Sequence, residues 1–141
     1  MNENHVRGTI SLNVHVYDVP YALELMVGSV VERNMPLIRH LFGQTEAEQL
    51  EGSPINFVDG WASSALVVSV DADPQEQGTY GYIVSRAAER YIAALREAGH
   101  QADTLHDASE THSTRVGRFG GAGDLTTEAT LRFIESIVTT P

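Results

Sequence analysis

The 141-residue chain contains no cysteine, so disulfide bonds, thiolate catalysis and cysteine-ligated zinc sites are all excluded. Basic residues are scarce: nine lysines and arginines stand against nineteen acidic residues, which gives a formal net charge of −10. Such a charge repels phosphate backbones and anionic lipid headgroups. We therefore expect neither nucleic acid nor a membrane surface as a partner.

Long apolar runs are also missing, since no stretch approaches the roughly 20 residues that span a bilayer. The first seven residues lack the basic-then-apolar pattern of a signal peptide. A cytoplasmic location is the resulting expectation. The length suits a single domain over residues 1–141, and the sequence shows no repeat and no low-complexity linker.

Three segments have strand patterns. Residues 9–17 alternate apolar and polar side chains, whereas residues 65–70 are apolar except for Ser69, as in a strand covered on both faces. Residues 102–106 form a shorter third segment. Helical segments separate the three, so their connections must cross over a sheet. The sequence predicts an α/β fold with a small parallel sheet of about three strands flanked by helices.

Helical patterns cover four stretches, which are residues 21–42, 46–50, 82–98 and 125–138. Pro36 interrupts the first stretch, so two helices are expected there, with Gly43 closing the second. Thr45 starts a capping-box sequence, and Asp124 is a suitable N-cap for the last helix. The stretches expected to be irregular or loops are residues 53–60, 71–81 and 107–123.

Two residues stand where an acid and a base would follow neighbouring strands. Asp73 lies in the turn Asp71-Ala72-Asp73-Pro74 after the apolar strand, and His112 follows the third strand within Glu110-Thr111-His112-Ser113. In open parallel sheets, functional groups lie beyond the carboxyl ends of the strands. We therefore expect the carboxylate of Asp73 to be directed toward His112, with Asp71 as the competing acid.

The order of strand, acid, helix, strand, histidine and helix resembles the C-terminal half of an α/β-hydrolase. The resemblance is closest to small carboxylesterases and kynurenine-formamidase-like enzymes. Additional segments look like parts of that family, namely Ser11–Val19, Leu41-Phe42-Gly43 and Glu51–Ile55. The resemblance implies that Asp73 is the acid and His112 the base of a catalytic triad. It also implies a small carboxylic ester or an aryl formamide as substrate. No cofactor and no metal are expected.

The serine nucleophile of that fold is missing. It would sit in a G-x-S-x-G elbow before both other residues, and neither this pentapeptide nor an oxyanion-loop motif occurs in the chain. One hypothesis is an esterase-like portion that is inactive without a serine-bearing companion. The alternative is a non-catalytic module, derived from a hydrolase, that self-associates or binds a ligand.

The resemblance also predicts an assembly. The strand that leads to the serine would flank residues 9–17, and without it their edge exposes unpaired backbone groups. We expect a homodimer, or a contact with an N-terminal hydrolase companion, through residues 9–17.

Two further sequence patterns indicate neither a metal site nor a phosphate-binding loop. The histidines at positions 100, 106 and 112 recur every six residues, which is not the spacing of convergent metal ligands. The glycine-rich stretch 117–123 lacks the Lys-Ser/Thr ending of a phosphate loop and is expected to be flexible.

Overall fold

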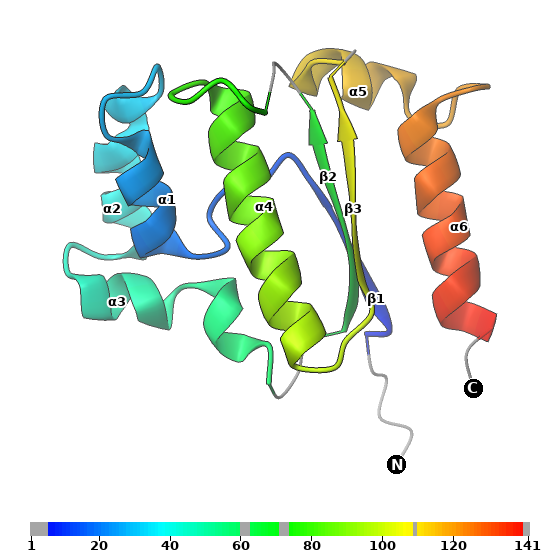
Figure 1. Cartoon of the computed structure of the whole chain (residues 1–141), viewed down its shortest axis with the longest axis horizontal. Coiled ribbons are helices and arrows are strands. Elements are labelled where there is room, and N and C mark those ends of the chain that lie inside the picture. The colour runs from blue at the N-terminus through cyan, green and yellow to red at the C-terminus, as the bar shows by residue number, and fades with distance from the viewer. Residues whose placement is uncertain (1–5, 60–62, 71–73, 109, 140–141) are drawn as a thin grey trace.

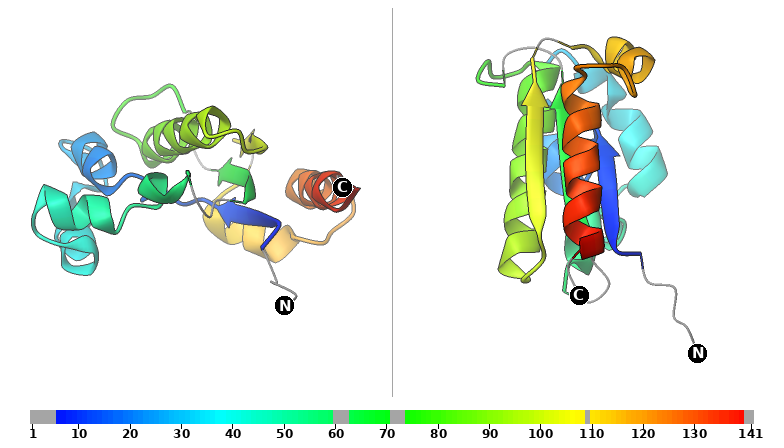
Figure 2. Two further views of the ribbon diagram at one scale, coloured as in Figure 1. Left: turned by 90° about the horizontal axis from the view of Figure 1, so that it is seen from below. Right: turned by 90° about the vertical axis from the view of Figure 1, so that its right-hand side faces the viewer.

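The computed structural model describes residues 6–59, 63–70, 74–108 and 110–139. Its centre is a small sheet covered on one face by helix α4 (Tyr80–Glu97) and on the other by helix α6 (Leu125–Thr139). The two views of Figure 2 show these helices on opposite sides of the strands. The chain therefore forms three layers, as expected when helical crossovers connect parallel strands.

The sheet has three parallel strands in the order β1 (Gly8–Leu12), β2 (Ser64–Val70) and β3 (Ala102–Asp107). Gly8 pairs with Ser64 on one side of the central strand, and Val70 pairs with Asp107 on the other. The predicted α/β class, with a three-stranded parallel sheet flanked by helices, is confirmed.

Strand β2 is the core of the molecule because both of its faces are covered. Ala65 and Val67 pack with α4, and Leu66 and Val68 pack with Phe133 of α6. All of its residues from Ala65 to Val70 are buried. This burial explains the nearly uninterrupted apolar run, which is typical of a strand between two helical layers.

The expected first strand, residues 9–17, is too long. Strand β1 ends at Leu12, because Asn13 adopts a left-handed conformation with φ of 56°. The Asn13 side-chain oxygen accepts a hydrogen bond from the backbone N–H of Val70, 3.2 Å away. Residues 14–17 leave the sheet, and Tyr17 stacks on Tyr91 of α4 with ring centroids 4.5 Å apart. Their alternating pattern thus reflects packing against helices, not strand pairing.

A separate group of short helices packs beside α4. It consists of α1 (Val19–Met26), the 3-10 turn η1 (Glu32–Asn34), α2 (Met35–Phe42), α3 (Glu46–Glu51) and the 3-10 turn η2 (Pro54–Phe57). The two helices predicted around Pro36 are present, although Pro36 lies in the first turn of α2 and so begins that helix. Gly43 ends α2 with φ of 111°, and Thr45 forms the predicted capping box with Glu48.

The stretch 107–123, expected to be a loop, is the second correction. It begins with the last residue of β3 and contains helix α5 (His112–Arg118). Helix α5 lies across the end of the sheet at which the strands point (Figure 1). Helices α4 and α6 otherwise match their predicted segments, with α4 starting two residues earlier behind its N-cap Thr79.

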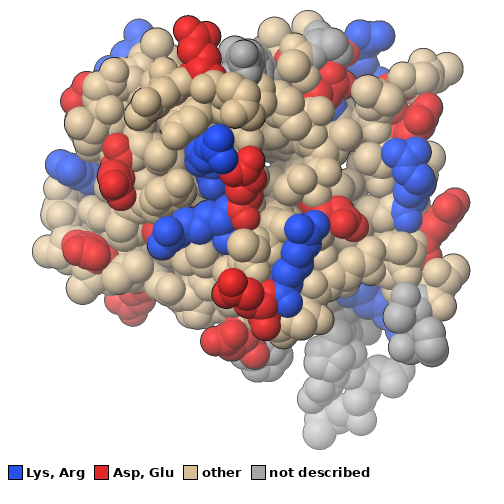
Figure 3. Space-filling view, in the orientation of Figure 1, with Lys and Arg blue, Asp and Glu red and all other residues tan. Residues whose placement is uncertain are grey.

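The visible surface carries charges of both signs close together. On the side of the molecule that bears α4, arginines alternate with acidic side chains and form no basic patch (Figure 3). Arg86 pairs with Glu89, and Arg90 pairs with Asp18 at 2.7 Å. Within the described ranges, no helix has the length and apolar character needed to cross a membrane.

Candidate active site

The carboxyl ends of the three strands meet at one end of the molecule, because all three strands run in the same direction. Residues that follow these ends are therefore brought together although they are far apart in the sequence. In open parallel sheets this is the end where functional groups gather. The candidate active site lies here, between the strand ends and α5.

The predicted base, His112, is the first residue of α5, five positions after the end of β3. Its backbone is described, but its side chain lies outside the described part of the structure. The predicted acid, Asp73, and its competitor, Asp71, also lie outside the described residues. Val70 and Asp107 are paired neighbours, so β2 and β3 end at adjacent positions in the sheet. The contact between carboxylate and imidazole stays a prediction.

The start of α5 is fixed by a helix-capping motif that the sequence analysis did not predict. The Thr111 hydroxyl accepts a hydrogen bond from the Thr114 N–H, and the Thr111 N–H donates to the Thr114 hydroxyl at 2.8 Å. This is a capping box with threonine in place of the usual Glu or Gln at the third helical position. The pattern Thr-x-x-Thr was the available signal, and it places His112 at the first helical position.

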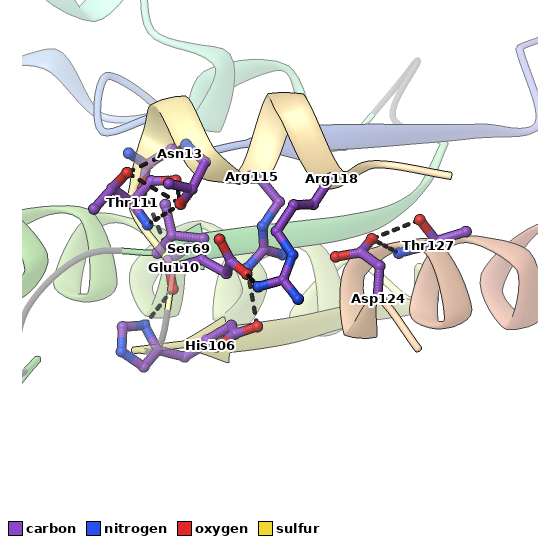
Figure 4. A network of polar contacts seen from close by, with 12 residues as sticks. Asn13, Ser69, His106, Glu110, Thr111, Arg115, Arg118, Asp124 and Thr127 are labelled. Carbon is purple, nitrogen blue, oxygen red and sulfur yellow. Dashed lines mark hydrogen bonds and ion pairs between the residues drawn. The ribbon is translucent and has the colours of Figure 1, made fainter. Parts of the chain in front are cut away.

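Two ion pairs connect α5 to the chain that precedes it. Arg115 donates to Asp107 at the end of β3 across 3.0 Å, and Arg118 pairs with Glu110. In Figure 4 both arginines extend from α5 toward the strand end and toward Asp124 at the start of α6. Arg115, Asp107 and Glu110 are almost completely buried, so these charges are largely removed from water.

Asp124 completes this polar region. Its carboxylate accepts hydrogen bonds from the N–H and the hydroxyl of Thr127, and so caps α6 as the sequence predicted. These hydrogen bonds, helped by the positive charges of Arg115 and Arg118, hold the pKa of Asp124 below its usual value. The ionised form of Asp124 is thus favoured where α5 and α6 meet.

A serine and a histidine do lie within hydrogen-bond distance inside the sheet. The Ser69 hydroxyl is 2.9 Å from Nδ1 of His106, on the face of the sheet that carries α4. Ser69 is only 5% exposed and lies within β2, so a substrate carbonyl cannot reach its oxygen. The buried Nε2 of His106 has no hydrogen-bond partner in the described part of the chain. The pair is a packing feature that the sequence did not reveal.

Two further polar residues cluster where β1 ends. The Tyr80 hydroxyl donates to the backbone oxygen of Asn13 at 3.3 Å and lies 3.4 Å from Nδ1 of His15. Burial lowers the pKa of His15, which favours its neutral form. These residues join β1 to the start of α4.

No metal centre is built by the described residues, among which no group of three or more His, Asp or Glu side chains converges. His100 lies near the opposite end of the sheet, where its Nε2 donates to the carbonyl of Val58 across 2.8 Å. His100 and His106 therefore serve separate contacts.

A separate hollow of about 370 Å³ opens where α1 ends and α4 begins. Its walls include Leu25, Val27, Gln77 and Tyr82. The mixture of apolar and polar walls suits a small organic molecule better than an ion.

Comparisons with known proteins support the architecture. No family model and no curated protein sequence matches the chain. Among solved structures, the chain is similar to an acylaminoacyl peptidase from Pyrococcus horikoshii, with a TM-score of 0.57 and 13% sequence identity. The match covers 97% of this chain but only 20% of the peptidase. The chain therefore spans about one fifth of the length of that peptidase, and the likeness shows a shared fold over that part.

Proposed function

We propose that this chain carries the acid and the base of a serine hydrolase, with Asp73 as the acid and His112 as the base. The observation that carries the proposal is the parallel pairing of β2 and β3, in which Val70 lies opposite Asp107. Asp73 follows the end of β2 by three residues, and His112 follows the end of β3 by five. The likeness to part of an α/β-hydrolase-fold enzyme supports the same assignment at the level of fold.

The proposed chemistry is proton transfer. The Asp73 carboxylate accepts the imidazole N–H, fixes the tautomer of His112 and stabilises the imidazolium. His112 removes the proton of a serine hydroxyl as the serine attacks the substrate carbonyl, and returns that proton to the leaving group. The proposed substrates are small carboxylic esters or aryl formamides, as the resemblance implies.

The serine must come from outside these 141 residues, because no G-x-S-x-G segment occurs in them. We propose that a serine-bearing companion supplies it by adding a strand to the outer edge of β1. The two outer strands of the sheet differ in a way that favours β1. Strand β3 carries the exposed Asp103, which pairs with Arg96, whereas β1 has no charged residue from Gly8 to Leu12. Charged edges discourage pairing with another strand, and uncharged edges permit it.

The surroundings of β1 favour burial as well. Its edge adjoins an apolar hollow of about 310 Å³ lined by Val14, Val16, Phe42 and Tyr91, among others. Ile10 is partly exposed beside it. A partner that covers this region removes apolar surface from water, and stable contacts of this type bury about 2,000 Å² or more.

The partner surface is tested by placing a lysine on each edge strand. Thr9→Lys in β1 is expected to abolish association with the companion, and Thr104→Lys at an exposed position in β3 is the matched control. Light scattering and mass spectrometry of material isolated at low micromolar concentration would identify the partner. A stable monomer that gains no activity from any companion would contradict the proposed partner. A dimer of identical chains would show instead that a second copy of this chain occupies the edge of β1.

Activity is tested with p-nitrophenyl acetate and a fluorophosphonate probe. The chain alone should show negligible turnover and no labelled serine, because loss of a triad member removes most of the rate. With the companion present, His112→Ala and Asp73→Asn should abolish turnover, whereas His40→Ala and Asp59→Asn at exposed positions should not. Stoichiometric labelling of a serine in this chain, or full activity of His112→Ala, would overturn the assignment. Full activity of His112→Ala would favour the alternative that this chain is a non-catalytic module.

A further inference from the structure

Helix α5 has little apolar surface with which to hold its place. Its seven residues include one aliphatic side chain, Val116, which is 63% exposed. Phe119, directly after the helix, is 48% exposed. A helix of this length is not stable in isolation, so contacts with the rest of the chain must hold it. Those contacts are polar.

The polar contacts repeat at one spacing. Asp107 pairs with Arg115 and Glu110 pairs with Arg118, so each acid is joined to an arginine eight residues later. The first pair ties the end of β3 to the middle of α5, and the second ties the connecting segment to the last turn. Both arginines also favour the ionised form of Asp124, which caps α6. Helix α5 is therefore held by ion pairs to the end of β3 and to the segment that connects β3 with α5.

The Asp107–Arg115 pair is costly to bury. Arg115 is 2% exposed, and its Nε and Nη1 have no hydrogen-bond partner in the described ranges of the chain. A buried ion pair of this kind contributes less to stability than a well-packed apolar pair of similar volume. Such a pair instead fixes an orientation, because a guanidinium bound to a carboxylate sets the relative placement of the two backbone segments that carry them.

We propose that Asp107 and Arg115 are positioning residues that hold α5, and with it His112 at its first position, against the carboxyl end of the sheet. The link to catalysis rests on the proposed function, in which His112 is the base. The clamp itself, made of the two ion pairs, does not depend on that function. Glu110 and Arg118 supply its outer half.

The test compares two asparagine substitutions on the same strand. Asp107→Asn removes the buried charge, and Asp103→Asn removes an exposed charge whose partner Arg96 lies 3.7 Å away. Amide hydrogen exchange of α5 and of β2 is measured in each variant, together with the NMR chemical shifts of the His112 ring.

The clamp predicts that Asp107→Asn raises the exchange rate of the α5 amides at least tenfold and shifts the His112 ring signals. The amides of β2 should keep their protection, and Asp103→Asn should change neither readout. Unchanged α5 exchange in Asp107→Asn would overturn the proposal. Equal loss of protection in α5 and β2 would also overturn it, because the pair would then stabilise the whole domain and not α5 in particular.

Asp107→Asn leaves the Arg115 charge buried without its partner, and this variant can fail to fold. Arg118→Gln then decides the question, since the Arg118 side chain is 68% exposed and its loss is tolerated by the core. It should raise α5 exchange and shift the His112 ring in the same direction by a smaller amount, and unchanged signals would contradict the clamp. If the clamp is found but His112→Ala leaves the companion complex fully active, the clamp stands and the proposed function falls.

Discussion

Alkaline pH should destabilise this domain, and Tyr17, close to β1, is the tyrosine with the large pKa shift. Burial raises the pKa of Tyr17 from its ordinary 10.0 to about 12, the Ser11 hydroxyl opposes that change, and nearby Tyr91 adds to it. The Tyr17 hydroxyl donates to Ser11 across 2.6 Å, and the residue is 4% exposed. The folded protein thus favours the neutral phenol.

The direction of the stability change follows from the linkage between proton binding and folding. A group whose pKa is higher in the folded state gives its full contribution below the unfolded value, and loses it as the pH rises through the folded value. For Tyr17 the window runs from about pH 10 to about pH 12. Two pH units at 1.36 kcal/mol each give a loss of up to about 2.7 kcal/mol. All nine basic residues are arginines, so no lysine titrates in this window.

Tyr17→Phe separates this effect from the hydrogen bond. At neutral pH the variant should be less stable by about 1 kcal/mol, because the bond to Ser11 is lost. It has no phenol to ionise, so its stability should fall less steeply above pH 10, and the two stability curves should cross near pH 11. Ser11→Ala keeps the phenol and should retain the alkaline loss. Urea unfolding followed by circular dichroism between pH 9 and 11.5 measures these differences, and parallel curves for wild type and Tyr17→Phe would refute the reasoning.

Three further substitutions test the fold, each by urea unfolding at neutral pH. Leu95→Ala removes a completely buried side chain of α4 and should cost about 3 kcal/mol, and a cost below 1 kcal/mol would contradict that packing. Gly43→Ala places a Cβ against Glu48 at a backbone φ of 111° and should cost about 2–3 kcal/mol, so an unchanged midpoint would refute the described turn. Asp124→Ala removes the cap of α6 and should cost about 1 kcal/mol at neutral pH. Because hydrogen bonds from Thr127 lower the Asp124 pKa from 3.8, this difference should vanish as the pH falls through that lowered value, and its persistence in acid would argue against the cap.

The central layer of the fold could be predicted from sequence because its signals are local. Residues 65–70 are apolar along their whole length, and α4 has a wide apolar face that places Ile83, Ile92 and Leu95 in the core. The parallel direction of the strands follows from the helical crossovers between them. These features depend on side-chain pattern alone, which is what a sequence displays.

The features that differ from the sequence prediction depend on contacts between residues far apart in the chain. The end of β1 depends on Asn13 bonding to the backbone of Val70, 57 residues away, and no local pattern records that bond. Helix α5 has no apolar stripe and is held by ion pairs to Asp107 and Glu110, so periodicity could not reveal it. The candidate site was placed at the strand ends by general rules for parallel sheets, and the pairing of Asp73 with His112 stays a prediction.

The most direct test of that pairing is an NMR titration of the His112 ring in the chain as it stands. A carboxylate beside an imidazole favours the protonated ring, so Asp73→Asn should lower the pH at which His112 titrates. Asp59→Asn, at an exposed position, should leave the titration unchanged. The same His112 titration curve in wild type and Asp73→Asn, or a change caused by Asp71→Asn instead, would contradict the assignment of Asp73 as the acid.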